Sequence, residues 1–223
     1  MLHIYGSMLS SPTNKVRYLV NFLQLPYEFH PVNLGAKEHR QPEFLKINPF
    51  GRIPAIDDNG FKLAESNAII RYLAAKSQST IYPDDLQQRA LIDQWIDFSS
   101  AHVLLALNKI MFNTYFYKFA GIPQDMHALR DGQQLINQFL PIIENQLTHS
   151  TYLLNNTFTV ADIAMLAALD VAECCQVDLT AFSHLTEWRK KLMGENFYSS
   201  VHSSYADMFN NILSQLNKAT TPA

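Results

Sequence analysis

The feature that most constrains the fold is a change of pattern about one third of the way along the chain. Before residue 77, short strand signals alternate with helix signals. After residue 84, long segments with helical periodicity follow one another and strand signals are few. This change predicts a small α/β domain over residues 1–78, followed by an all-α domain over residues 85–216. A chain of 223 residues is long enough to bury a substantial core.

The first domain is expected to have the element order β-α-β-(α)-β-β-α. Strands are predicted at residues 2–6, 27–32, 53–56 and 61–64. The first helix has apolar residues at 16, 19, 20 and 23, which is the spacing of one helix face. A short helical stretch around residues 42–47 follows, and a last helix runs from its N-cap, Ser66, to about residue 76.

The second domain is expected to consist of helices at residues 85–113, 124–147, 159–175, 181–193 and 203–216, with a frayed tail over residues 217–223. Thr159 and Asp162 have the spacing of a capping box, in which side chains satisfy the free N–H groups at a helix start. We interpret this motif as structural and assign no chemistry to it.

Composition excludes several classes of protein. Hydrophobic residues make up 48% of the chain and charged residues 17%, which rules out disorder. A net charge of −3 argues against nucleic-acid binding. The two cysteines are adjacent, at Cys174 and Cys175, and neither a CxxC pair nor a zinc-ligand spacing is present, so no metal is expected. Without a signal peptide or a membrane-spanning run, a cytoplasmic protein is expected.

Three short segments of the first domain could carry chemistry. Ser10-Ser11-Pro12 stands at a predicted helix N-terminus, where a hydroxyl and free N–H groups favour an anion. Pro54 enters a strand, and a cis bond before it would turn the backbone of Ile53 towards an extended ligand. Glu65-Ser66 suits the head group of an α-amino acid. Taken singly, the first two segments are better explained as an ordinary turn and a strand junction, and Glu65-Ser66 is equally explained as a helix cap.

Together, these segments resemble the glutathione transferase family, and the resemblance spans nearly the whole chain. The first 20 residues, LHIYGSMLSSPTNKVRYLV after the initial Met, resemble the opening of the family. The stretch NPFGRIPAIDDNGFKLAESNAIIRYLA is its most specific match. TVADIAMLAAL resembles the capping motif of the helical domain, and Leu185-Thr186-Glu187-Trp188 its closing segment. The resemblance implies a thioredoxin-like first domain, an all-helical second domain, and a theta- or phi-like cytosolic enzyme of bacterial type.

The resemblance implies that a serine stabilises the glutathione thiolate. Ser10, six positions before Val16, matches the catalytic serine of the serine-type members, and Ser11 is the alternative. No cysteine lies in the first domain, which argues against the cysteine-type members. Tyr5 stands one residue short of the catalytic position in tyrosine-type members and is interpreted as a strand residue.

The glutathione contacts are carried over to matching positions. His39, Arg40 and Arg52 correspond to the residues that hold the glycyl end of the peptide; Arg40 stands where phi-like members often have lysine, and Arg52 where glutamine or lysine is usual. The cysteinyl and γ-glutamyl units are expected to contact Ile53 beside a cis Pro54, and Glu65 with Ser66.

An electrophile site is expected between the domains. Its expected lining is Met8, Leu9, Met111, Phe112, Tyr115, Phe116 and Phe119, although the aromatic residues could equally belong to the helix core. The expected reaction is attack of the thiolate on a small apolar electrophile, with glutathione as co-substrate.

Several alternatives remain open from the sequence. SSPTNKVR resembles the signature of the maleylacetoacetate-isomerase branch, except that Pro12 replaces its cysteine. Peroxidase and disulfide-reductase activities would use the same thiolate. A non-catalytic interaction module on the same fold is also possible, although it need not keep the ligand-binding residues. The family resemblance implies a homodimer that uses the helix Ser66–Lys76 and the helix beginning near Gln87.

Overall fold

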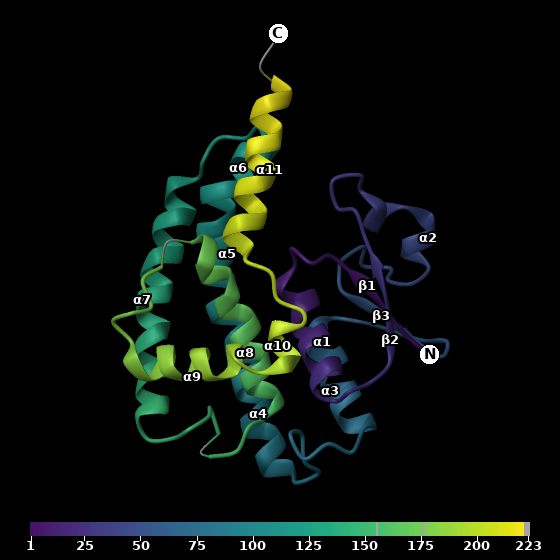
Figure 1. Ribbon diagram of the computed structural model, residues 1–223, viewed down its shortest axis with the longest axis vertical. Coiled ribbons are helices and arrows are strands. Elements are labelled where there is room, and N and C mark those ends of the chain that lie inside the picture. Colours follow the sequence, from purple (N-terminus) through teal and green to yellow (C-terminus); the bar gives the residue numbers. More distant parts are fainter. Residues whose placement is uncertain (155, 176, 221–223) are drawn as a thin grey trace.

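The computed structural model describes residues 1–154, 156–175 and 177–220, with only the backbone described for residue 119 and residues 215–220. The strands gather on one side of the molecule and most helices on the other, with α1 (Ser11–Phe22) and α3 (Ser66–Lys76) between the sheet and the helical part (Figure 1). No helix in these ranges is long and apolar enough to cross a membrane.

The first domain is built on a four-stranded sheet in the order β2-β1-β3-β4. β1 pairs in parallel with β2 and antiparallel with β3, which in turn pairs antiparallel with β4. The strands are β1 (Leu2–Gly6), β2 (Tyr27–Pro31), β3 (Ala55–Asp58) and β4 (Phe61–Ala64). β3 begins two residues later than expected, because Pro54 has no N–H to donate to a ladder.

The two faces of the sheet are covered differently. Leu2 and Ile4 belong to the main core, which also contains buried residues of α1, α3 and the helical domain. On the other face, a smaller cluster joins Ala55 and Tyr5 to Phe44 of the short helix α2 (Pro42–Leu45). The 3₁₀ turn η1 (Glu38–Arg40) precedes α2. The order βαβαββα agrees with the thioredoxin-like domain expected from the sequence.

The second domain is helical throughout its described elements. They are α4 (Leu86–Phe98), η2 (Ser99–Leu104), α5 (Leu105–Met111), η3 (Phe112–Phe116), α6 (Tyr117–Ala120), α7 (Met126–Thr148), α8 (Val160–Asp170), η4 (Val171–Cys174), α9 (Ser183–Met193), α10 (Asn196–Ser199) and α11 (Tyr205–Thr220).

The helix boundaries correct several expectations. The helix expected to end at residue 113 continues through two π-helical segments to Ala120. The short α10 was not expected, and α11 continues to Thr220, so residues 217–220 are helical rather than frayed. Residues 221–223 of the expected tail lie outside the described residues. The capping box at Thr159 and Asp162 is present.

α1 ties the two domains together through buried hydrogen bonds. The Ser11 hydroxyl donates to the carbonyl of Ala167 in α8 at 2.6 Å. The Tyr18 hydroxyl donates to the carboxylate of Asp170 at 2.7 Å, and the Asn14 amide donates to the Tyr205 hydroxyl at 2.9 Å. Because polar atoms are satisfied across this contact, the position of α1 relative to the helical domain is well defined.

Candidate active site

The start of α1 gives its two serines different roles. Ser10 is the N-cap residue, and its hydroxyl oxygen accepts a hydrogen bond from the backbone N–H of Thr13 at 3.3 Å. An accepting hydroxyl keeps its own proton for another acceptor. Ser11 is buried and already donates its proton to Ala167. Of the two, only Ser10 can therefore donate to a ligand without breaking a contact between domains.

The same helix start carries further positive character. Pro12, the second residue of α1, has no N–H, and the N–H of Thr13 is capped by Ser10. The helix dipole favours an anion at this end of α1. The first turn of α1 contains no acidic residue that would neutralise the dipole.

A pocket of about 270 Å³ opens beside this helix start. Residues from three segments line it, namely Pro12, Arg52, Ile53, Pro54, Glu65 and Ser66. The Ile53–Pro54 peptide bond is cis, as the sequence analysis considered. Ile53 lies two residues before β3, outside the paired register of the sheet. The first-domain segments singled out from the sequence thus surround one pocket.

Glu65 adopts an unusual backbone conformation at the edge of this pocket. Its φ of 65° and ψ of 109° place it in a sparsely populated region. Glu65, rather than the expected Ser66, is the N-cap residue of α3, and its side chain makes no capping hydrogen bond. The exposed carboxylate is therefore available to a cation, and Ser66 is the first helical residue. Non-glycine residues in such conformations cluster at ligand sites.

A second corner of the site is positively charged. The Nδ1 atom of His39 is buried and has no hydrogen-bond partner. Burial, and then the charges of Arg40 and Arg52, lower the pKa of His39. The loop before Arg52 packs closely on this corner, since a Cβ at Gly51 would lie 3.0 Å from the His39 carbonyl oxygen. An anionic group bound here would relieve the repulsion among these three side chains.

An apolar pocket of about 530 Å³ lies on the other side of the β1–α1 loop. Its described lining is Ser7, Met8, Leu9, Pro31, Val32, Asn33, Glu38, Met208, Asn211 and Ile212. Met8 and Leu9 were expected here, whereas the contribution of α11 was not. The signal that could have found it is the helical spacing of Tyr205, Met208 and Ile212 in the last segment.

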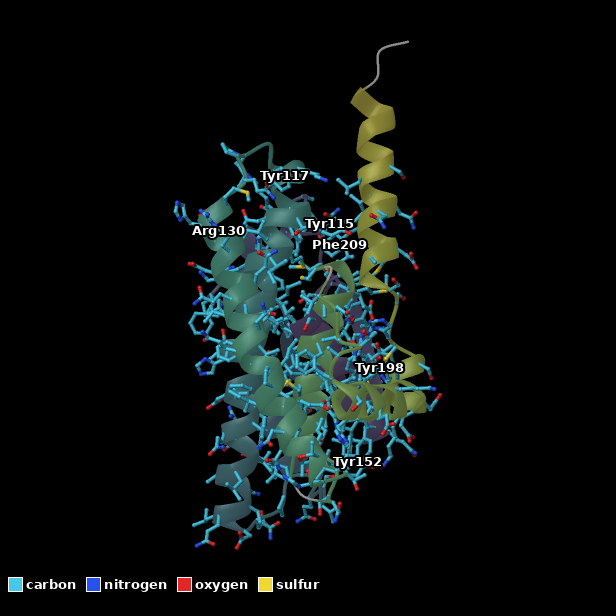
Figure 2. The ribbon with its side chains drawn as sticks, turned by 90° about the vertical axis from the view of Figure 1, so that its left-hand side faces the viewer. Tyr115, Tyr117, Arg130, Tyr152, Tyr198 and Phe209 are labelled. Carbon is cyan, nitrogen blue, oxygen red and sulfur yellow. The ribbon has the colours of Figure 1, made fainter. Side chains whose placement is uncertain are left out.

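The aromatic segment expected to line this pocket is placed differently. Tyr115 lies beside Phe209 of α11 (Figure 2). The ring centroids of Tyr115 and Phe116 are 5.5 and 5.3 Å from that of Phe209. Met111 is buried, and Phe112 is exposed and contacts Phe116. None of these four side chains is among the described lining of the apolar pocket. Tyr115 and Phe116 support α11 through Phe209 instead. The side chain of Phe119 lies outside the described residues.

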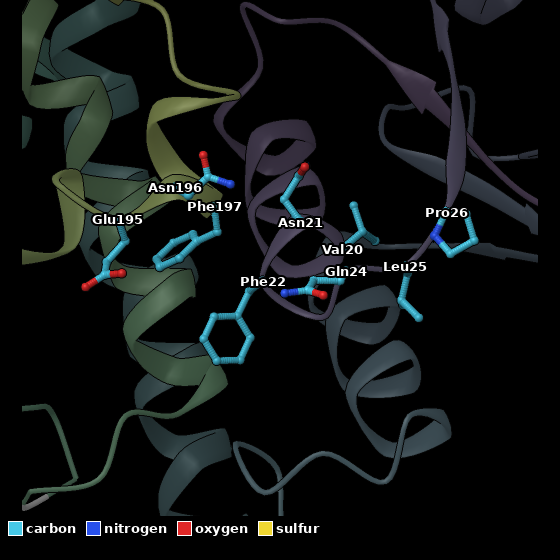
Figure 3. Close-up of a pocket in the computed structure, with 9 residues that line it drawn as sticks. All are labelled: Val20, Asn21, Phe22, Gln24, Leu25, Pro26, Glu195, Asn196 and Phe197. Atoms are coloured by element: carbon cyan, nitrogen blue, oxygen red, sulfur yellow. The ribbon is translucent and has the colours of Figure 1, made fainter.

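A third hollow, of about 520 Å³, lies at the far end of α1 (Figure 3). Phe22 and Leu25 line it from the α1–β2 turn, and Glu195 and Phe197 from the region of α10. It contains none of the candidate site residues, and it is separated from Ser10 by the length of α1. We therefore place the site at the helix start.

Fold and site together define a class of protein. The chain is a two-domain protein with a thioredoxin-like ligand-binding domain, in which a cis-proline and two helix starts surround a polar pocket, and with an all-helical domain behind it. Comparison with known proteins narrows this class. Residues 1–75 match the N-terminal domain of glutathione S-transferase, and residues 108–196 match the C-terminal domain.

The chain belongs to the glutathione S-transferase family, and it is a glutathione transferase, an enzyme that conjugates glutathione to electrophiles. It is 30% identical over 197 residues to a probable glutathione S-transferase, GSTF2, of Oryza sativa subsp. japonica, covering 86% of this chain and 91% of that protein. It is 28% identical to glutathione S-transferase F10 of Arabidopsis thaliana, covering 92% and 98%.

Solved structures agree with this assignment. Glutathione S-transferase I from maize, in complex with an atrazine glutathione conjugate, superposes with a TM-score of 0.80 at 27% identity, covering 90% of this chain and 95% of that one. A delta-class enzyme of Nilaparvata lugens superposes with a TM-score of 0.83 at 25% identity, covering 96% and 99%. These relatives come from plants and insects, so they give no support to the bacterial type expected from the sequence.

Proposed function

We propose that Ser10 activates glutathione by donating a hydrogen bond to its thiolate, as in serine-type, theta- or phi-like members of the family. The observation that carries this proposal is the different engagement of the two serine hydroxyls: Ser11 donates into the domain contact, while Ser10 only accepts from Thr13. Ser10 also follows Leu9, which lines the apolar pocket, and precedes Pro12, which lines the polar one. A sulfur beside Ser10 would therefore face both pockets.

The stabilisation that a hydroxyl and a helix start give to a thiolate is large enough to ionise glutathione without a general base. A free thiol with a pKa of about 8.5 is only ~3% ionised at pH 7. Lowering that pKa by about two units requires ~2.7 kcal/mol of preferential stabilisation of the anion. A hydrogen bond to an anion supplies ~1.5–3 kcal/mol, and a helix N-terminus adds ~0.3–1 kcal/mol. The thiol proton leaves to solvent, and the thiolate then attacks the electrophile by displacement or conjugate addition.

The polar pocket is proposed to hold the peptide of glutathione. The corner formed by His39, Arg40 and Arg52 suits the glycyl carboxylate, since the two guanidinium groups offer positive charge beside the imidazole. The backbone of Ile53, beside the cis Pro54, is available to the cysteinyl unit.

At the other end of the peptide, Glu65 and the start of α3 are proposed to hold the γ-glutamyl group. The carboxylate of Glu65 can pair with the ammonium group, and Ser66 with the N-terminal N–H groups of α3 can bind the carboxylate. The two ends of glutathione thus meet residues of complementary charge.

The electrophile is proposed to bind in the apolar pocket between the β1–α1 loop and α11. Met8, Leu9, Met208 and Ile212 supply an apolar lining to an aromatic or aliphatic substrate. Placing the electrophile there puts it next to Ser10, so the lining itself orients the substrate towards the sulfur.

We also propose a homodimer that uses α3 and α4. Within the chain, two ion pairs join these helices: Arg71 of α3 pairs with Asp93 at 2.6 Å and with Asp97 at 2.8 Å, both in α4. A rigid pair of helices suits a subunit contact. A sedimentation mass near twice 25.5 kDa at micromolar concentration is expected. A mass near 25.5 kDa would contradict the dimer.

Glutathione binding tests the proposed site directly. Calorimetry and thermal unfolding with millimolar glutathione should show binding and a raised melting temperature for the parent. Glu65→Gln should weaken binding by roughly 10–100-fold, because it removes a hydrogen-bonded charge worth ~1.5–3 kcal/mol. Glu195→Gln is the matched control, since Glu195 is also an exposed helix N-cap residue without a side-chain capping bond.

Two outcomes would overturn this assignment. An unchanged affinity in Glu65→Gln would remove the γ-glutamyl contact. The absence of any heat and any thermal shift in the parent would favour the non-catalytic module instead. If the parent binds glutathione, turnover on aryl halides, epoxides, hydroperoxides and mixed disulfides, each with glutathione, separates conjugation from peroxidase or reductase activity.

A further inference from the structure

Two histidines and a glutamate meet on one face of the sheet, and none of them is among the described lining of the pockets above. The Nδ1 atom of His3 lies 2.9 Å from Nε2 of His30 and 3.4 Å from a carboxylate oxygen of Glu28. The other carboxylate oxygen of Glu28 lies 3.7 Å from Nε2 of His30. All three side chains are accessible, with 31%, 33% and 59% of the surface of His3, His30 and Glu28 exposed.

The pairing of two strands brings these residues together. In the parallel register of β1 and β2, His3 is opposite Glu28 and Tyr5 is opposite His30. Side chains two residues apart on a strand point to the same face, so Glu28 and His30 lie beside His3 and Tyr5. The ring of Tyr5 stacks on His30 at 4.7 Å with an interplanar angle of 16°, which fixes the orientation of that imidazole.

The spacing of the three ligating groups is that of a metal site. Zinc binds imidazole nitrogen and carboxylate oxygen at about 2.0–2.2 Å in a tetrahedral arrangement, so the ligand atoms lie about 3.3–3.6 Å from one another. Of the observed separations, 3.4 Å lies within this range, 2.9 Å lies below it and 3.7 Å lies above it. Small side-chain rotations would therefore bring the two ring nitrogens and one carboxylate oxygen of Glu28 to bonding distance of one ion.

We propose that His3, Glu28 and His30 bind a divalent transition-metal ion, and that this ion is Zn²⁺. Two imidazoles and one carboxylate suit Zn²⁺ rather than Mg²⁺ or Ca²⁺, which require more oxygen ligands. In the metal-free protein, one of the facing ring nitrogens donates a hydrogen bond to the other. Metal binding needs both lone pairs, so the shared proton moves to the remaining nitrogen of its own ring.

The fourth coordination position would face solvent and hold water, because only three described groups converge here. The ion would connect His3 of β1 to Glu28 and His30 of β2. None of these three residues is among the described lining of the polar or the apolar pocket, so zinc at the cluster would not occupy either pocket. Bound zinc is expected to raise the melting temperature without being required for conjugation.

A second group with similar residue types does not have these properties. Asp170, Glu173 and His202 also lie close together, but Arg189 pairs with both carboxylates, at 3.2 and 2.9 Å. Tyr18 also donates to Asp170. These groups already have partners in a buried network, whereas the cluster on the sheet is open to solvent.

The test uses the untagged full chain, freed of metal by a chelator and studied without glutathione, whose thiol would bind zinc. Calorimetric titration with zinc chloride should show one ion per chain, and Co²⁺ should give the visible absorption of a tetrahedral site. Glu28→Gln and His30→Ala should each weaken Zn²⁺ binding by about tenfold or more, as the loss of even a supporting partner costs roughly 10–100-fold. His149→Ala, which removes an exposed histidine elsewhere, should bind like the parent.

Three results would each overturn the proposed zinc site. The parent could fail to bind zinc at micromolar concentration, either cluster variant could keep the affinity of the parent, or His149→Ala could lose binding. Circular dichroism and conjugation activity of the metal-free variants, both expected to match the parent, show that the variants are folded. Glu28→Gln is nearly isosteric at an exposed position, so it keeps the test decisive even if His30→Ala folds poorly.

Discussion

Ser11→Ala is expected to lower stability while leaving catalysis unchanged. The Ser11 side chain is 4% exposed, and its hydroxyl donates to the carbonyl of Ala167 at 2.6 Å across the domain contact. Removing it takes a donor from a buried carbonyl, at a cost of about 1–3 kcal/mol. In a chain of this length, 1 kcal/mol corresponds to roughly 2–4 °C, so the melting temperature should fall by roughly 2–12 °C.

The assay pairs thermal unfolding with kcat/KM for conjugation, measured at a temperature where the parent and variant are both folded. Ser77→Ala serves as the control for losing a serine hydroxyl, because Ser77 is exposed at the end of α3 and should change neither quantity. A fall in kcat/KM of about tenfold or more in Ser11→Ala, with an unchanged melting temperature, would refute the reasoning. It would mean that this hydroxyl acts on the substrate rather than on the domain contact.

Three further predictions follow from buried or pocket-lining groups. Asp162→Asn should destabilise the protein by about 2–4 kcal/mol, because the carboxylate accepts from the N–H groups of Leu153, Thr159 and Trp188; an unchanged urea midpoint would contradict this. Burial lowers the pKa of Lys15 to about 7, so the unfolded chain binds more protons above pH 7 and stability should rise with pH there. Lys15→Met should remove this slope, of up to ~1.4 kcal/mol per pH unit, in urea titrations at about pH 7.5 and 9. The same change in unfolding free energy with pH in parent and variant would exclude Lys15 as its source. Met208→Ala should raise the KM for apolar electrophiles roughly fivefold and leave that for glutathione unchanged, whereas a change in both would mean that the pocket is not selective.

Local signals in the sequence predicted much of the fold. The two-part organisation, the first strand, the helices starting near Ser11 and Ser66, and the capping box at Asp162 all depend on neighbouring residues, and the structure has them. The third strand was misplaced by two residues, since its start depends on where Pro54 leaves the ladder. The residues expected at the polar pocket were found through the family resemblance as well as through local chemistry.

Features that depend on distant contacts could not be predicted in this way. Asn113 accepts from the N–H of Asp125 through its side chain and from Gln124 through its carbonyl, which holds the π-helical segment where the sequence suggested a helix end. Part of the lining of the apolar pocket comes from α11, at the far end of the chain, and Tyr115 packs on Phe209 of that helix. The cluster at His3 exists only through the register of β1 against β2.

The central claim is that the Ser10 hydroxyl stabilises the glutathione thiolate, and the ultraviolet absorbance of that thiolate tests it most directly. The absorbance of bound glutathione is followed against pH in the parent, Ser10→Ala and Ser11→Ala. Ser10→Ala should move the midpoint upward by about 1–2 pH units, equivalent to ~1.4–2.7 kcal/mol. Turnover at neutral pH should fall roughly 10–100-fold, and Ser11→Ala should follow the parent curve. A Ser10→Ala curve that overlays the parent, or a shift in Ser11→Ala instead, would contradict the assignment.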